Sequence, residues 1–330
     1  MPIEGGGRPL LVVLRALGLG DFLTGVPALR ALADAYPEHR RVLVAPQAIA
    51  PLAELTGAVD DVVDAAPLAP LDPSLRGPDV AVNLHGKGPQ SHRVLLAARP
   101  RRLVSFANPD VPESADGPPW RAGEHEVHRW CRLLEALGIS ADPNRLDLDL
   151  PSEILASAPE EARGATLVHP GAASAARHWP AERWIEVARS EAANGRSVIV
   201  TGGPEEADLG RIVVRAARLP DSAARAGRTD LLELAALVAL ANRVVCGDTG
   251  VAHLATALGT PSVVLFGPTS PSEWGPPPER PWHRVLWAGG MGDPHADIPD
   301  AGLLSIQVRQ VLEALDALPQ AWPSSAAGSR

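Results

Sequence analysis

Short apolar runs alternate with longer amphipathic segments along most of the chain. In the first half, apolar runs at residues 10–14, 42–45, 80–84 and 103–106 are separated by segments compatible with helices, such as residues 90–98. Apolar runs of this length, bounded by Gly, Pro or polar residues, are typical of buried strands. The first half is therefore predicted to be a parallel sheet wrapped by helices.

The second half repeats this alternation. Its predicted strands cover residues 166–169, 197–201, a short stretch near Ala223, 243–246 and 262–266. Its predicted helices cover residues 181–194, 205–217, 231–241, 251–258 and 307–318. An amphipathic helix at 127–137 precedes a segment, residues 138–164, that is rich in Pro, Asp, Ser and Ala and is predicted to be a linker. The expected fold is thus α/β, with two doubly wound Rossmann-like domains at residues 1–150 and 151–330.

Length and charge agree with two domains and limit the possible ligands. The chain has 330 residues, about twice the size of an ordinary domain. No apolar run approaches the roughly 20 residues of a membrane span, and no leader pattern is visible, so a cytoplasmic protein without a transmembrane segment is expected. The net charge of −9 disfavours nucleic acid as a partner, and the two cysteines have no metal-site spacing. The tail beyond Pro319 is predicted to be disordered.

The first apolar run ends in a glycine turn with a carboxylate. Gly18, Leu19 and Gly20 invite comparison with a dinucleotide-binding fingerprint, but the third glycine is replaced by Leu23, which disfavours an NAD site. Asp21 follows at the start of a predicted helix. It is a candidate general base, and the alternative is that it only caps the helix.

A second corner, Asp248, Thr249 and Gly250, lies between a predicted strand and a predicted helix. The free N–H groups and the dipole at a helix start favour an anion, so Thr249 and Gly250 are predicted to bind a phosphate. A carboxylate would be repelled by phosphate, and Asp248 is therefore predicted to accept hydrogen bonds from sugar hydroxyls. The alternative is an ordinary turn with an aspartate cap.

A glycine and small-residue loop at 169–180 ends near an arginine. Arg177 would give the charge-assisted, bidentate contact that phosphate prefers, and Ser174 and the loop amides would satisfy further oxygens. The alternative is a solvated surface arginine, because most of the arginines in the chain must lie at the surface.

Weaker candidates stand at the other strand ends. Turns at Gly202 and Gly203 and at Thr229 are predicted to face a nucleotide, and His253 to contact phosphate or sugar, although a lone histidine in a helix is more often structural. The predicted acceptor contacts are Gly20, Asn83, His85 and Lys87. For the last three the alternative is a polar loop.

Several of these motifs together resemble glycosyltransferase family 9, the heptosyltransferase-like enzymes, in order and spacing. They are LRALGLGDFLTGVPALRAL at 14–32, DVAVNLHG at 79–86, HPGAASAARHWPAERW at 169–184, GGPEE at 202–206 and DTGVAHLATALGTPSVVLFGPT at 248–269. The resemblance implies a GT-B fold, with two Rossmann-like domains facing across a cleft. It places the acceptor on the N-terminal domain and the nucleotide sugar on the C-terminal domain.

The same resemblance implies an inverting transferase that uses no metal or other cofactor. Asp21 matches the family's catalytic base, and Asp248 would hold the donor sugar. Arg177 and the amides of Thr249 and Gly250 would meet the charge of the departing diphosphate. The family usually has lysine where Arg177 stands, which keeps the charge and changes its geometry.

The resemblance implies ADP-heptose as the donor. The charge of the first half of the chain bears on the acceptor. Family members act on a phosphorylated lipopolysaccharide core, but residues 1–160 carry 15 Lys plus Arg against 21 Asp plus Glu, a net charge of −6. This favours a neutral or cationic acceptor, such as an aminoglycoside in an antibiotic pathway, over a large anionic one. Two other functions stay open: a nucleotide-sugar epimerase, which needs no acceptor, and a non-catalytic nucleotide-sugar binding protein, against which the presence of Asp21 argues.

Overall fold

The structure is a computed structural model in which residues 7–319 are described. The chain divides into two compact units, unit 1 and unit 2, between Leu146 and Asp147. This point lies within the segment that the sequence predicts to be a linker. The tail predicted to be disordered, from residue 320 onward, lies outside the described residues.

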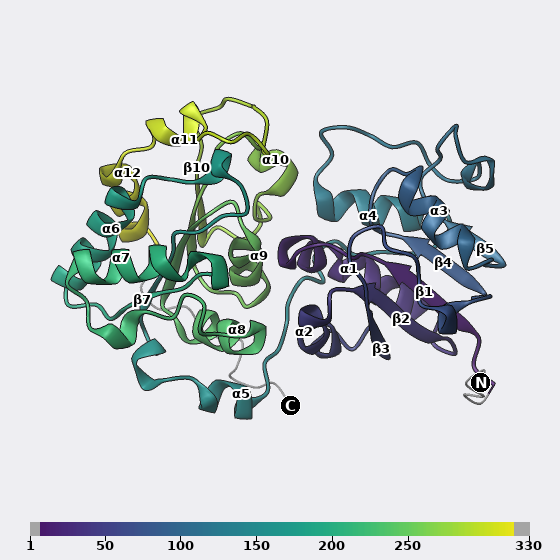
Figure 1. Ribbon diagram of the computed structural model, residues 1–330, viewed down its shortest axis with the longest axis horizontal. Coiled ribbons are helices and arrows are strands. Elements are labelled where there is room, and N and C mark those ends of the chain that lie inside the picture. Colours follow the sequence, from purple (N-terminus) through teal and green to yellow (C-terminus); the bar gives the residue numbers. More distant parts are fainter. Residues whose placement is uncertain (1–6, 320–330) are drawn as a thin grey trace. The chain divides into compact units, whose positions relative to one another are not determined.

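Unit 1 is a five-stranded parallel sheet with helices packed against it (Figure 1). The strand order is β3-β2-β1-β4-β5. The strands are β1 (Leu10–Leu14), β2 (Arg40–Ala45), β3 (Asp61–Asp64), β4 (Val80–Asn83) and β5 (Arg102–Val104). The helices are α1 (Leu19–Ala35), α2 (Ala50–Leu55), α3 (Gln90–Ala97) and α4 (Glu126–Glu135). Helix α1 packs against α4.

Unit 2 has the same architecture with a different strand order, β10-β9-β8-β6-β7, again all parallel. Its strands are β6 (Thr166–His169), β7 (Val198–Val200), β8 (Arg243–Gly247), β9 (Ser262–Leu265) and β10 (His283–Leu286). Its helices are α5 (Ser152–Ser157), α6 (Ala181–Ala193), α7 (Ala207–Ala217), α8 (Leu231–Leu240), α9 (Gly250–Ala257), α10 (Pro271–Trp274), α11 (Ala301–Ser305) and α12 (Val308–Asp316).

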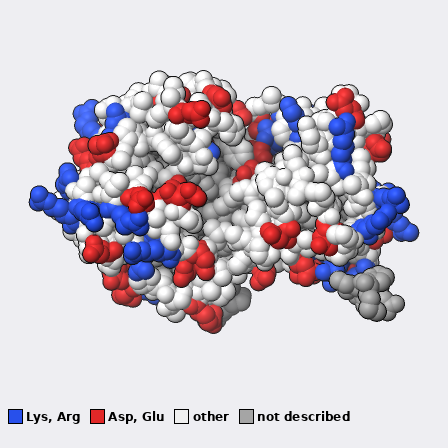
Figure 2. Space-filling view, in the orientation of Figure 1, with Lys and Arg blue, Asp and Glu red and all other residues white. Residues whose placement is uncertain are grey.

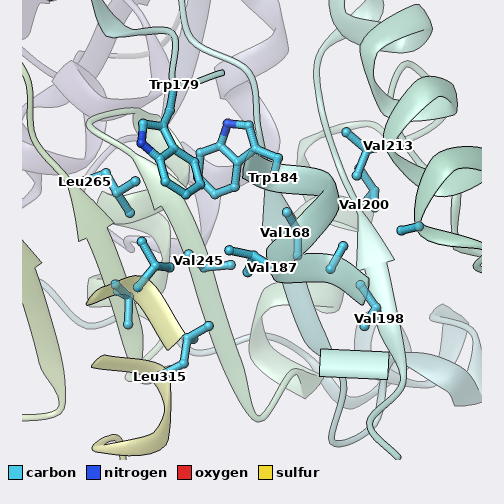
Figure 3. Packing of buried hydrophobic residues seen from close by; sticks show 14 of the residues in the cluster. Val168, Trp179, Trp184, Val187, Val198, Val200, Val213, Val245, Leu265 and Leu315 are labelled. Carbon is cyan, nitrogen blue, oxygen red and sulfur yellow. The ribbon is translucent and has the colours of Figure 1, made fainter. Parts of the chain in front are cut away.

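The central strands β4, β6 and β8 are buried along their whole length and apolar in the middle, because helices cover both faces of a parallel sheet. In unit 2, Trp179 and Trp184 lie beside Val168, Val245 and Leu265 of three neighbouring strands (Figure 3). The two indole rings meet edge to face, with centroids 4.8 Å apart. Such a pair adds roughly 0.5–1.5 kcal/mol to the burial of its surface. The pair fixes the end of the loop that follows β6.

The predicted fold class, two doubly wound α/β domains, is confirmed. Two edge strands, β3 and β10, were missed because their sequences, DVVD and HRVL, contain charged or polar residues at exposed edges. The prediction of a strand near Ala223 is wrong. Residues Asp221–Ala223 form a 3-10 turn, and the chain makes only an isolated parallel bridge from Ala224 to Val200 beside β7.

The strand orders locate the places where ligands bind in such sheets. Ligands bind beyond the carboxyl ends of the strands, where the order of the strands reverses. In unit 1 this point lies between the neighbours β1 and β4, and in unit 2 between β6 and β8. The loops that follow these four strands carry most of the predicted site residues.

Charge is distributed without an extended basic surface on the face drawn in Figure 2, where acidic and basic side chains are mixed over both units. Within residues 7–319, no helix has both the length and the apolar character needed to cross a membrane. Nor do the described His, Cys, Asp and Glu residues form a group of three or more that could hold a metal ion.

Candidate active site

Asp21 lies in the first turn of α1, three residues after Gly18, which stands at the N-cap. Its carboxylate accepts hydrogen bonds from the backbone N–H groups of Gly18 and of Asp21 itself. No side-chain hydrogen bond caps the helix at Gly18. The glycine turn places the carboxylate beyond the carboxyl end of β1, where a ligand of this sheet would bind.

The surroundings of Asp21 raise its pKa above the ordinary value of 3.8. Burial is the largest cause, because it disfavours the charged form. The guanidinium of Arg15 lowers the pKa, and the carboxylate of Glu126 raises it. A carboxylate with a raised pKa holds a proton more strongly, which is the property required of a general base.

Arg15, directly after β1, has a side chain with no exposed surface. Its Nε donates to the carbonyl oxygen of Asp21 and its Nη1 to that of Leu84. Its Nη2 donates to Thr24 Oγ1 at 3.0 Å and lies 3.4 Å from Glu126 Oε1. Gly25 is required here, because a Cβ at that position would lie 2.8 Å from Arg15 Nε. Arg15 thus ties the loop after β1 to the loop after β4.

The loop after β4 carries three of the predicted acceptor contacts. Asn83 is completely buried, and its amide donates to Gly86 O at 3.1 Å and Ser91 Oγ at 2.9 Å, with His92 Nδ1 also 3.1 Å from the amide nitrogen. Its Oδ1 accepts from the backbone N–H of His85. In this structure Asn83 therefore shapes the loop, and a direct contact with an acceptor stays a prediction.

His85 and Lys87 are the more accessible groups of that loop. Lys87 is exposed and His85 is half-buried, with Nδ1 buried and unpaired among the described residues. Burial lowers the pKa of His85, and the nearby Arg15 lowers it further, so the neutral imidazole is favoured. Gly20, in the first turn of α1, completes the predicted acceptor set next to Asp21.

In unit 2, Asp248 follows β8 and is buried. Burial raises its pKa to about 6, although Arg177 and a hydrogen bond with Thr269 act in the opposite direction. Thr249 is the N-cap of α9, but its side chain makes no cap bond, and its buried hydroxyl has no hydrogen-bond partner within the described chain. The helix therefore begins at Gly250 with unused donors, as a bound anion would require.

Arg177 reaches this corner from the loop after β6. Its Nη1 donates to the carbonyl oxygen of Asp248 at 3.2 Å, and its buried Nε has no partner among residues 7–319. The same loop is fastened to a later segment, because Ser174 Oγ donates to Pro294 O and the Ala176 amide to Ala296 O. Arg177 is therefore a half-buried group with a free donor, rather than a solvated surface arginine.

The glycine turn after β7 joins the same region through Glu206. The backbone N–H of Gly203 donates to Glu206 Oε2 at 2.6 Å, and His169 Nε2 lies 4.0 Å from that oxygen. A Cβ at Gly171 would lie 1.8 Å from Glu206 Oε1, and a Cβ at Gly202 would be 3.0 Å from Glu206 Oε2. The glycines thus make room for this carboxylate. Burial lowers the pKa of His169, and Glu206 opposes this change.

Two further candidates border this region. The N–H of Gly227 donates to Gly202 O, which brings the turn before Thr229 against the turn after β7. Thr229 itself is half-buried. The ring of His253, in α9, meets that of Trp274 at 6.0 Å between centroids. The loops after β6, β7, β8 and β9 therefore converge in unit 2.

Several charged residues at these sites are not among the candidates predicted from the sequence. Arg15 could have been found, since it is a charged residue directly after an apolar strand and before a glycine turn. Glu126 and Arg129 are three residues apart on an amphipathic helix, a spacing that signals a pair but not what it pairs with. Glu206 lies within the GGPEE motif, but its contacts depend on two loops, those after β6 and β7, that are distant in sequence.

Comparison with known proteins identifies the family. Residues 118–288, just over half of the chain, match glycosyltransferase family 9 (heptosyltransferase). The chain belongs to glycosyltransferase family 9. The matched region includes α4 of unit 1 and most of the converging loops of unit 2.

Curated relatives carry names from the same family. Lipopolysaccharide heptosyltransferase 3 of Escherichia coli is 28% identical over 169 residues, 49% of this chain and 48% of the relative. Lipopolysaccharide heptosyltransferase 1 of Pseudomonas aeruginosa is 36% identical over 152 residues, 45% of this chain and 41% of the relative. The chain spans about half the length of the curated relatives it matches.

Solved structures extend the likeness over nearly the whole chain. The ADP-heptose LPS heptosyltransferase II of Escherichia coli has a TM-score of 0.75 at 22% identity and covers 93% of this chain and 98% of its own. The glycosyltransferase family 9 protein of Veillonella parvula has a TM-score of 0.76 at 20% identity, with 93% and 96% covered. This family 9 chain therefore has the GT-B fold, as predicted.

Proposed function

We propose that this family 9 chain is a glycosyltransferase that moves a heptose from ADP-heptose to a hydroxyl group of a carbohydrate acceptor. Family membership and the names of the relatives support a heptosyltransferase. One observation supports the proposal most strongly. Unit 1 presents a half-buried carboxylate with a raised pKa, and unit 2 presents hydrogen-bond donors that are unpaired within the described residues, each at the ligand end of its sheet.

The donor diphosphate is proposed to bind at the start of α9. The amides of Thr249 and Gly250, the Thr249 hydroxyl and the free Nε of Arg177 are donors for its oxygens. Asp248 would accept hydrogen bonds from hydroxyls of the sugar. The turns at Gly202, Gly203 and Thr229 would face the nucleoside, and Ser174 and His253 would border the site.

The proposed reaction is a single displacement with inversion. Asp21 takes the proton of the acceptor hydroxyl while the acceptor oxygen forms a bond to the anomeric carbon of the heptose. The bond from that carbon to the diphosphate oxygen breaks on the opposite face, and ADP leaves with the electron pair. Arg177 and the helix N-terminus stabilise the charge on ADP. In this proposal these groups suffice without a metal.

The acceptor near Asp21 is proposed to carry no negative charge. Residues 15–18 and 84–89, the loops after β1 and β4, carry two permanent cations, Arg15 and Lys87. Arg15 is buried and engaged in internal contacts, and His85 favours its neutral form. These loops thus offer little positive charge to a phosphorylated acceptor. A neutral or cationic carbohydrate, such as an aminoglycoside, fits them better than a phosphorylated lipopolysaccharide core.

The first test is calorimetric titration of the protein with ADP-heptose and with UDP-, GDP- and dTDP-sugars, in buffer containing a metal chelator. Selective binding of ADP-heptose supports the proposed donor and the proposed independence from metal. Selective binding of another nucleotide sugar would discard heptose and keep the transferase.

Transfer is then measured by mass spectrometry with two acceptors, a phosphorylated lipopolysaccharide core and an aminocyclitol glycoside. Preference for the glycoside supports an acceptor without negative charge, and preference for the core would overturn that part. NMR of the product shows whether the anomeric configuration is inverted. Conversion of the donor sugar with no acceptor present would instead indicate an epimerase.

A further inference from the structure

Glu126, the first residue of α4, is a buried carboxylate with three partners. Its side chain is 7% exposed, and it accepts from Trp130 Nε1 at 2.8 Å and from Arg129 Nη1. Its other partner is Arg15 Nη2. A buried charge is tolerated only with such partners, and removing one member of the set leaves the others uncompensated.

Through Arg15, Glu126 acts on two loops at once. The guanidinium of Arg15 lies 4.9 Å from the centroid of the Trp130 ring, so α4 holds it by stacking as well as by charge. The same guanidinium donates to the carbonyl oxygens of Asp21 and Leu84. Helix α4, the first turn of α1 and the end of β4 therefore meet at one side chain.

The charges that face Asp21 come from two elements besides its own helix. Arg15, after β1, favours the ionised carboxylate, and Glu126, on α4, disfavours it. The backbone amides of Gly18 and Asp21 also favour the ionised form, and burial opposes it. Arg15 also lowers the pKa of His85, which follows β4. Arg15 and Glu126 thus act on Asp21 in opposite directions while contacting each other.

We propose that Glu126 is a positioning residue for the transfer reaction: it holds Arg15 in place against α1 and β4 and offsets the positive charge of Arg15 beside Asp21. The inference rests on the proposed function only in taking Asp21 as the base. Glu126 itself is directed at Arg15, Arg129 and Trp130 and acts through them.

The test is the pH dependence of kcat/KM for Glu126→Gln. Without the negative charge of Glu126, the attraction of Arg15 is no longer offset, so the acid limb of the profile should move to lower pH by about half a unit or more. The plateau should fall by about tenfold at most, since a weaker base accepts the proton less well. A limb at the wild-type pH, or at higher pH, would overturn the inference, because a purely structural role changes only the plateau.

Glu124→Gln is the matched control. Glu124 lies two residues away and binds Arg132 through Nε at 2.6 Å and Nη2 at 2.7 Å, without contact to Arg15. Its removal breaks an ion pair of the same type, and it should leave the acid limb in place.

Arg129→Gln tests the same idea with the opposite sign. It removes a cation that compensates Glu126 and leaves the contacts of Arg15 intact, so the limb should move to higher pH. This variant decides the question if Glu126→Gln does not fold. A shift to lower pH would contradict the inference.

A readout without turnover separates this inference from the proposed function. The carboxyl resonance of Asp21, assigned with Asp21→Asn, is titrated by carbon-13 NMR in the wild type and in each variant. A lower pKa in Glu126→Gln supports the inference even if no transfer is found with any acceptor. An unchanged pKa would refute it even if the enzyme is active.

Discussion

The two units carry sites at equivalent places in their sheets, yet the arginines at these sites, Arg15 and Arg177, are paired differently. In unit 1, all three guanidinium nitrogens of Arg15 donate to groups of the protein. In unit 2, Arg177 Nε and the Thr249 hydroxyl are buried without partners in the part of the chain that is described. Each site also has a carboxylate whose pKa is raised by its removal from water and lowered by its arginine; Asp248 is buried and Asp21 is half-buried.

This difference indicates different tasks. A fully paired network fixes charges before any ligand arrives, which suits a group that must take up a proton. Unpaired buried donors cost about 1–3 kcal/mol each, and that cost is recovered when an anion accepts from them. In the proposed function, unit 1 is therefore preorganised for chemistry, and unit 2 is prepared for binding. Substitutions at the site in unit 1 should consequently lower kcat, and substitutions at the site in unit 2 should weaken the binding of the donor nucleotide.

The largest expected effect comes from Asp21→Asn. The amide keeps the shape of the carboxylate but takes no proton, so kcat should fall by about a thousandfold, within the range found for general bases. The affinity for ADP-heptose, measured by calorimetry, should stay within about twofold of the wild type. Asp34→Asn, which changes an exposed carboxylate of the same helix, is the control. A substantial residual rate would remove Asp21 from the role of base.

Arg177→Ala, in contrast, is expected to weaken binding. Loss of the free Nε and of the positive charge should weaken ADP binding by about a hundredfold, as for a charge-assisted contact that is partly buried. Arg177→Lys should recover part of the affinity, because it keeps the charge and loses the bidentate geometry. Arg211→Ala, at the exposed face of α7, should bind ADP as the wild type does. Equal affinities for all three variants would end the comparison between the units.

The sequence was sufficient to predict the alternation of strands and helices, because each central parallel strand has an apolar run at its middle. It failed at the edges, where β3 and β10 carry polar residues, and at Ala224, where the chain runs beside β7 and forms a single bridge. Local pattern contains no information on whether a passing segment pairs over one residue or four.

For the candidate site, sequence motifs marked the loops but not the contacts within them. The glycines at positions 171 and 202 are visible in the sequence, whereas the reason for them, the space needed by Glu206, depends on how the loops after β6 and β7 meet. In the same way Asn83 reads as an available amide, and folding buries it completely. The connection from Glu126 through Arg15 to Asp21 joins residues more than 100 positions apart, so no local pattern could predict it.

A smaller effect, in stability rather than activity, is expected for Asp248→Asn. The pKa of Asp248 in the folded protein is about 6, above its ordinary value of 3.8, so keeping the carboxylate ionised costs free energy above pH 6. This cost decreases as the pH falls through 6 and is absent below about 4. Asn carries no charge, and the variant should be more stable than the wild type by about 2 kcal/mol at pH 7.5.

The measurement is urea unfolding of both proteins at pH 7.5 and at pH 4.5, where the difference should be much smaller. Asp208→Asn, which removes an exposed ion pair with Arg211, should change stability little at either pH. A variant less stable than the wild type at pH 7.5 would mean that the contacts of Asp248 with Arg177 and Thr269 outweigh its burial. In that case the two units would not share a carboxylate whose ionised form destabilises the folded protein.

The smallest expected effect is that of Gly171→Ala, and it tests whether unit 2 depends on close backbone packing. The added Cβ would fall 1.8 Å from Glu206 Oε1, so the carboxylate must move away from the Gly203 N–H and from His169. We expect ADP binding to weaken by about three- to tenfold, because one loop of the converging set is displaced and no direct donor is lost. Gly290→Ala, where a Cβ meets nothing within 4 Å, is the matched control. Wild-type affinity in Gly171→Ala would mean that Glu206 can move freely. The preparation of unit 2 for binding would then reside in Arg177 and the start of α9 alone.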